Sequence, residues 1–158
     1  MPDVLPDHDF FMQEALYEAR IARLTGDVPV GAVVVVDGTI IGRGRNCREV
    51  LNDPTAHAEI IALRDTAQQL GSWRLTAAAL YVTLEPCIMC IGAAISSRIR
   101  ALVFGCEDPK AGACGSQFDI IGAQRLNHTF PIISGVCRAE ASTLLSEFFR
   151  KLRFNKSK

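Results

Sequence analysis

Residues 79–90 have the sequence Ala79-Leu80-Tyr81-Val82-Thr83-Leu84-Glu85-Pro86-Cys87-Ile88-Met89-Cys90. The first six of these residues predict a buried strand, because apolar and β-branched side chains dominate a short run. Pro86 predicts the start of a helix, since proline is tolerated in a first helical turn. Residues 101–105 form a second apolar run and predict another buried strand. A strand, a helix and a strand in this order favour two parallel strands joined by a helical crossover.

A helix and a β-hairpin are predicted ahead of this unit. Residues 30–36 and 39–44 flank the pair Asp37-Gly38, which is typical of a two-residue hairpin turn. Before them, residues 9–25 carry apolar side chains at helical spacing, and Gly26 follows as a stop. The N-terminal part therefore supplies one amphipathic helix and two antiparallel strands.

Three further elements complete the predicted order. Asp53 is expected to cap a helix that ends at Gly71, which places the residues after Asp53 in an opening helical turn. Residues 128–134 predict a weaker last strand, and residues 138–153 predict a last helix. This order predicts an α/β fold: a three-layer α/β/α domain with a mixed five-stranded sheet, covering residues 1–158 as one domain.

Composition and charge limit the classes of function. Lys plus Arg (17) balance Asp plus Glu (17), so affinity for a polyanion must come from local clusters of charge. The first nine residues lack the basic and apolar regions of an export signal, and no apolar run reaches the roughly 18 residues of a membrane span. We therefore expect a cytoplasmic protein with no membrane partner, whose six cysteines are free thiols or metal ligands.

One imidazole and two thiols have the spacing of a catalytic zinc site. His57 lies two residues before Glu59, and Cys87 and Cys90 share one helix face at i and i+3. A structural zinc site uses four protein ligands, whereas His57, Cys87 and Cys90 leave a position for water. We predict one Zn²⁺ per subunit, with Glu59 as the base of a hydrolysis. Residues i and i+2 of an ideal helix point apart, so His57 and Glu59 converge only if the first turn is irregular or Glu59 bends back.

Other interpretations of the cysteine pair are a redox pair or one half of a structural zinc ribbon. The chain has no second Cys-x-x-Cys to complete a ribbon, and a redox pair requires neither His57 nor Glu59. The remaining cysteines and histidines are not expected to bind zinc: Cys47, Cys106, Cys114, Cys137, His8 and His128. The four cysteines of this group are expected to be small buried residues, His8 to be solvated and His128 to be structural.

A motif His-x-Glu followed by Pro-Cys-x-x-Cys is the signature of zinc nucleobase deaminases. Residues 53–60 and 81–90 together resemble the bacterial tRNA-specific adenosine deaminases, within the cytidine deaminase-like superfamily. The similarity in order and spacing includes residues 28–33 and 108–112 and extends over roughly residues 10–153.

The resemblance implies a function and a set of site residues. It implies hydrolysis of adenosine to inosine at the wobble position of a tRNA anticodon, by zinc-activated water with Glu59 as proton shuttle. It also implies that Asn46 contacts the target base and that Val28 and Leu84 line its pocket. The anticodon arm of tRNA and a second copy of the chain, in a homodimer, are the implied partners.

A basic cluster near the C-terminus has two interpretations. Five Lys and Arg residues and no acidic residue occupy the last nine positions, which suits a phosphate backbone and makes Phe149, Arg150 and Arg153 candidate RNA contacts. A solvated helix end is the alternative, because cations are common at helix C-termini. Phe148 is expected in the core, because it shares helical spacing with other apolar residues.

Two rival functions stay open. Another zinc deaminase, acting on free guanine, cytosine or deoxycytidylate, would carry the same metal motif. The segment 108–116 and the basic C-terminus favour tRNA over a free base. A noncatalytic, zinc-stabilised RNA-binding subunit is the second rival, and the presence of Glu59 argues against it.

Overall fold

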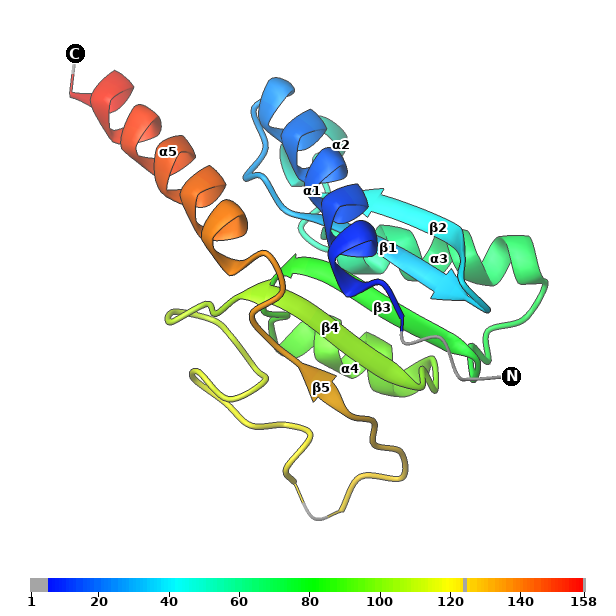
Figure 1. Cartoon of the computed structure of the whole chain (residues 1–158). Coiled ribbons are helices and arrows are strands. Elements are labelled where there is room, and N and C mark those ends of the chain that lie inside the picture. Colours follow the sequence, from blue (N-terminus) through cyan, green and yellow to red (C-terminus); the bar gives the residue numbers. More distant parts are fainter. Residues whose placement is uncertain (1–5, 124, 158) are drawn as a thin grey trace.

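The computed structural model describes residues 6–123 and 125–157 and contains one mixed sheet (Figure 1). The strand order is β2-β1-β3-β4-β5, with β1 antiparallel to β2 and β3, and β4 parallel to β3 and β5. The strands are β1 (Gly31–Val36), β2 (Thr39–Arg45), β3 (Ala78–Leu84), β4 (Ala101–Cys106) and β5 (Ile132–Ile133). The predicted mixed five-stranded sheet and its helical crossover between β3 and β4 are confirmed.

Helices cover both faces of the sheet, as the three-layer prediction requires (Figure 1). The helices are α1 (His8–Leu24), α2 (Arg48–Leu51), α3 (Ala58–Leu70), α4 (Ile88–Ser96) and α5 (Arg138–Lys156). α1 and α5 lie on one face, α3 and α4 lie on the other, and the C-terminal turns of α5 extend beyond the sheet (Figure 1). None of these five helices combines the length and apolar character needed to cross a bilayer.

Each central strand contributes to two hydrophobic cores, because successive side chains of a strand point to opposite faces. Val33 and Tyr81 pack with α1 and α5, whereas Val34 and Leu80 pack with α3 and α4. All four side chains are buried. Burial on both faces explains why β1 and β3 are nearly continuous apolar runs and not alternating ones.

Two glycines of β2 allow α3 to pack directly on the backbone of this strand. A Cβ atom on Gly44 would overlap the Ala58 carbonyl oxygen, and one on Gly42 would overlap the Thr66 hydroxyl. The first turn of α3 is therefore fixed against the sheet, and this turn carries the Glu59 side chain.

Three predicted element boundaries are wrong. The helix expected to start at Pro86 begins only at Ile88, and Cys87 is its N-cap with extended backbone. The helix expected from a cap at Asp53 begins only at Ala58, because the Asp53 carboxylate instead accepts the N–H (2.8 Å) and hydroxyl (2.7 Å) of Thr55 in a local turn. The last strand shrinks from residues 128–134 to β5, since Pro131 has no N–H to donate and Gly135 turns the chain with φ +85°.

The close contact between α3 and β2 generates a stability prediction. Gly44→Ala should lower the free energy of unfolding by about 2 kcal/mol or more, because the added methyl forces α3 away from the sheet. Urea unfolding followed by circular dichroism measures the change. Gln68→Ala, at an exposed position of the same helix, is the control. Equal losses in both variants would contradict the packing argument.

Candidate active site

Two helix N-termini bring the predicted metal ligands together. His57 is the N-cap of α3 and Cys87 is the N-cap of α4, and both have extended backbone, with ψ of 154° and 177°. Cys90 follows in the first turn of α4. Unpaired N–H groups and the helix dipole at these ends favour thiolates and disfavour a charged imidazole.

The ligand atoms have the spacing of one tetrahedral ion. His57 Nδ1 lies 3.6 Å from Cys87 Sγ and 3.4 Å from Cys90 Sγ, and all three atoms lie within 4.8 Å of one another. Tetrahedral bonds of about 2.3 Å to sulfur and about 2.0 Å to nitrogen place such atoms about 3.5 Å apart. The group can therefore bind a metal, and its two sulfurs and one imidazole suit zinc.

The hydrogen bond between the two thiols shifts their pKa values in opposite directions. The Cys90 thiol and then the His57 imidazole lower the pKa of Cys87 to about 3. The contact with Cys87 and burial raise the pKa of Cys90, and the same sulfur, Cys87 Sγ, raises the pKa of His57. Cys87 is therefore a thiolate at neutral pH, which is the protonation state that binds a metal.

Glu59 lines the same cavity as His57 and Cys87. Its side chain is 4% exposed, and burial raises its pKa. A raised pKa suits a carboxyl group that must both accept and return a proton near neutral pH. The two side chains can converge because His57 is the N-cap of α3 and lies outside the helix, so the i, i+2 separation of an ideal helix does not apply.

A cleft of about 730 Å³ lies over these groups, and the predicted base contacts Asn46, Val28 and Leu84 line it. Asn46 is 7% exposed. Its Nδ2 donates to the Val28 carbonyl oxygen and its Oδ1 accepts from the Arg48 N–H, both at 3.2 Å. These bonds fix the amide plane and leave one N–H and one lone pair for a ligand.

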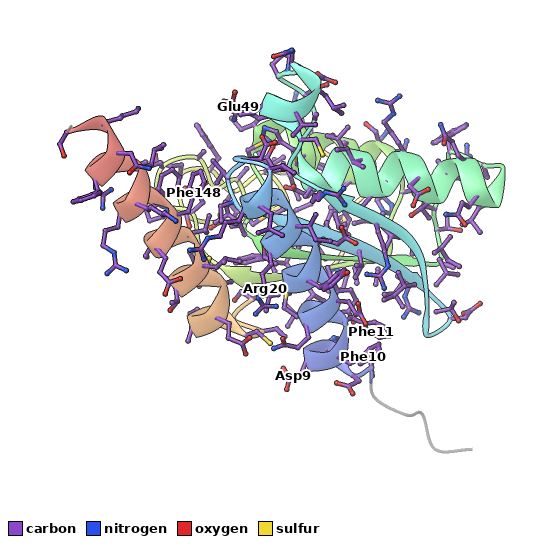
Figure 2. All side chains as sticks on the ribbon, turned by 90° about the horizontal axis from the view of Figure 1, so that it is seen from above. Asp9, Phe10, Phe11, Arg20, Glu49 and Phe148 are labelled. Carbon is purple, nitrogen blue, oxygen red and sulfur yellow. The ribbon has the colours of Figure 1, made fainter. Side chains whose placement is uncertain are left out.

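The predicted RNA contacts on α5 do not share one surface. Phe149 and Arg153 line the cleft. Arg150 instead lines a separate hollow that it shares with Arg23 and Glu147. Phe148 is half-buried, meets the Phe149 ring edge-to-face at 5.4 Å, and lies on the side of α5 that faces the rest of the domain (Figure 2).

Two residues that sequence patterns did not single out also line the cleft. Arg48 lies in α2 at the exposed rim, and Glu85, between β3 and Pro86, is only 2% exposed. Burial alone would raise the pKa of Glu85, but hydrogen bonds from the Ser116 hydroxyl and from backbone N–H groups outweigh it and lower that pKa. A charged residue directly after a buried strand was the available signal for Glu85.

The other two histidines form hydrogen bonds away from the metal-ligand group. His8 was expected in solvent, but its Nδ1 lies 2.8 Å from the Tyr81 hydroxyl, which makes it a structural residue. His128 is structural as expected, since its Nε2 lies 2.7 Å from the Ile99 carbonyl oxygen.

The other cysteines are less buried than expected, with one exception. Cys106 is buried and lines the cleft, whereas Cys47, Cys114 and Cys137 are half-buried. Burial raises the pKa of Cys106 to about 11 and that of Cys114 to about 12. Both thiols are therefore protonated at neutral pH.

Known proteins are similar to this chain over most of its length. A family model described as MafB19-like deaminase matches residues 6–153. A tRNA-specific adenosine deaminase of Haemophilus influenzae is 51% identical over 146 residues, which are 92% of this chain and 84% of that protein.

Solved structures give the same relationship. One, from a study of A-to-I editing by tRNA:A34 deaminases at the wobble position of transfer RNA, has a TM-score of 0.84 and 45% identity and covers 86% of this chain and 99% of its own. The guanine deaminase of Bacillus subtilis has a TM-score of 0.63 and 35% identity and covers 79% of this chain and 83% of its own. Since identity and structural overlap are both higher with the tRNA enzymes, the chain belongs to the tRNA-specific adenosine deaminases, within the cytidine deaminase-like superfamily.

Proposed function

We propose that this protein hydrolyses the wobble adenosine of a tRNA anticodon to inosine and ammonia. One observation carries the chemistry: a buried carboxyl group, Glu59, shares a cleft with a metal-ligand group and with the fixed amide of Asn46. The names of the relatives support the substrate, since they denote deaminases of tRNA and of its wobble adenosine.

Each group of residues in the cleft has its own role in the proposed reaction. One Zn²⁺ per subunit, held by His57, Cys87 and Cys90, would supply a Lewis acid that makes water nucleophilic at neutral pH. Glu59 accepts one proton from the attacking water and gives it to the ring nitrogen. It then accepts the proton of the hydroxyl group added to the base and gives it to the amino group, which leaves as ammonia. Asn46 orients the base with its remaining N–H and lone pair.

The apolar walls and the rim complete the proposed site. Val28 and Leu84, which line the cleft, would exclude water from around the bound base. Phe149 can stack on a flanking base, and Arg153 can contact a phosphate. Arg150 remains a candidate for a separate phosphate contact on α5. We place the reaction in the cytoplasm, where tRNA is found.

A homodimer is part of the proposal. The α4 helix has no charged residue, and Ile88 on its outer side is 50% exposed, with Met89, Gly92 and Ala93 half-buried beside it. A second copy that covers this apolar surface would bury it next to the metal ligands.

The substrate prediction separates this function from its rivals. Zinc-loaded protein is incubated with unmodified bacterial tRNA and, in parallel, with free guanine, cytosine and adenosine, and products are quantified by mass spectrometry. We expect inosine at the wobble position and no product from the free compounds. Product from a free base alone would assign the protein to the deaminases of free bases.

The role of Glu59 is tested by Glu59→Gln, which keeps the size of the side chain and removes its basicity. The rate of inosine formation should fall by about 10³-fold, because general acid–base catalysis of this kind contributes 10²–10⁴-fold. Zinc content and tRNA binding should stay unchanged. Glu140→Gln, at an exposed partner of Gln13 and Arg20 that does not line the cleft, is the matched control. Unchanged turnover of Glu59→Gln removes this residue from the mechanism.

Metal content tests the ligand group directly. The purified protein should hold about one zinc per chain by elemental mass spectrometry, and His57→Ala should lower this to near zero because two thiols alone bind zinc weakly. Cys137→Ala, at a cysteine outside the group, should keep the full content. Full zinc occupancy in His57→Ala would exclude the proposed ligand set.

A further inference from the structure

We propose that Glu85 is a positioning residue that fixes the loop of residues 108–116 as a wall of the substrate cleft. Its effect on catalysis rests on the function proposed above, whereas its contact with the loop does not. Glu85 is only 2% exposed, yet no Lys or Arg side chain forms an ion pair with it among the described residues.

Four donors from one loop surround the Glu85 carboxylate. Oε1 accepts the Asp108 N–H at 3.1 Å and the Ser116 hydroxyl. Oε2 accepts the N–H groups of Cys114 at 2.9 Å and Ser116 at 3.2 Å. Hydrogen bonds to a charged acceptor are the strong ones, so the carboxylate replaces its lost hydration with donors from both ends of this loop.

The same segment also binds the loop through its backbone. The Pro86 carbonyl oxygen accepts the Ala113 N–H of the loop at 2.8 Å. The Glu85 N–H donates at 2.9 Å to the carbonyl oxygen of Cys106, the last residue of β4 before the loop. Cys87, a predicted metal ligand, is the next residue after Pro86. A single short stretch therefore joins the metal-binding helix to the loop.

Gly112 shows how closely the loop fits around the carboxylate. A Cβ atom at this position would collide with the Glu85 carboxyl group and with the Asp108 carbonyl oxygen. Only a hydrogen fits there without a shift of the loop or of Glu85. The contact is thus specific in shape as well as in charge.

Saturation of both oxygens argues against a catalytic role. Each carboxylate oxygen already accepts two hydrogen bonds, so Glu85 is not free to take a proton from a substrate. The contact of Glu85 with the loop instead fixes the position of Asp108, Lys110 and Ala111, which line the cleft. A loop that is not held in place must be ordered when substrate binds, and this cost weakens binding more than it slows chemistry.

Glu85→Gln tests the inference in zinc-loaded, full-length protein. The variant leaves the side chain nearly unchanged in size but turns an amide NH₂ toward backbone N–H donors. With a wobble-adenosine anticodon stem-loop RNA, we expect KM to rise about tenfold and kcat to stay within about threefold. The backbone amides of Asp108, Cys114 and Ser116 should exchange hydrogen about tenfold faster by mass spectrometry, because these three N–H groups donate to the altered carboxylate.

Two further variants keep the test decisive. Gly112→Ala approaches the same contact from the loop side and should raise KM in the same way. Ser116→Ala removes one donor, should raise KM by about threefold, and serves if Glu85→Gln does not fold. Asp119→Asn is the matched control, since this carboxylate accepts only the Gly122 N–H (3.0 Å) among the described side-chain bonds and does not line the cleft.

The outcomes separate this inference from the proposed function. Wild-type KM and wild-type exchange in Glu85→Gln overturn the positioning role, as does a loss of kcat with KM unchanged. Absence of RNA deamination by the unaltered protein overturns the proposed function, and the exchange measurement then decides by itself whether Glu85 holds the loop.

Discussion

The site depends on the packing of α3 and α4 on one face of the sheet, with their N-termini directed at a common point. Alternating side chains of β1 and β3 provide the apolar surface for both helices, and glycines of β2 let α3 come close. The N-caps of these helices are His57 and Cys87, so the helix ends that stabilise a thiolate also deliver the ligands. The energy of the hydrophobic core is thereby used to hold a polar site in shape.

The N-cap position of His57 decides whether this predicted metal ligand and the Glu59 carboxyl group can face the same cleft. Within a helix, residues two apart diverge by about 200°. His57 has ψ of 154° and is outside the helix, while Glu59 is inside it and buried against the cleft. A His-x-Glu motif therefore requires a helix that begins between its two functional residues. The Asp53 turn, which ends the preceding segment before the helix, satisfies this requirement.

Elements with a strong periodic pattern could be predicted from the sequence, and those set by local side-chain bonding could not. The hairpin, the crossover unit and the helices at both ends follow from runs of apolar residues, which tertiary packing then buries. The start of α3 was wrong because Asp53 bonds to Thr55 instead of capping a helix, an outcome that the same residue types permit. Glu85 escaped prediction because its four donors come from a loop more than twenty residues away, and loop geometry has no period.

Helix geometry also sorts the residues of α5. Ser142, Ser146, Phe149 and Arg153 recur at spacings of three and four and line the cleft, whereas Arg150 is one position away from Phe149 and points to another hollow. The proposed catalytic groups and the residues proposed to select the substrate thus lie on different elements of the fold. In the proposed mechanism, the N-terminal ends of α3 and α4 carry the metal ligands and the acid–base group, while α5 and the loop that contacts Glu85 line the cleft where a substrate would bind. A change of substrate within this fold would therefore be expected in α5 and this loop and not in the metal-binding helices, because loops and a projecting helix can vary without disturbing the core.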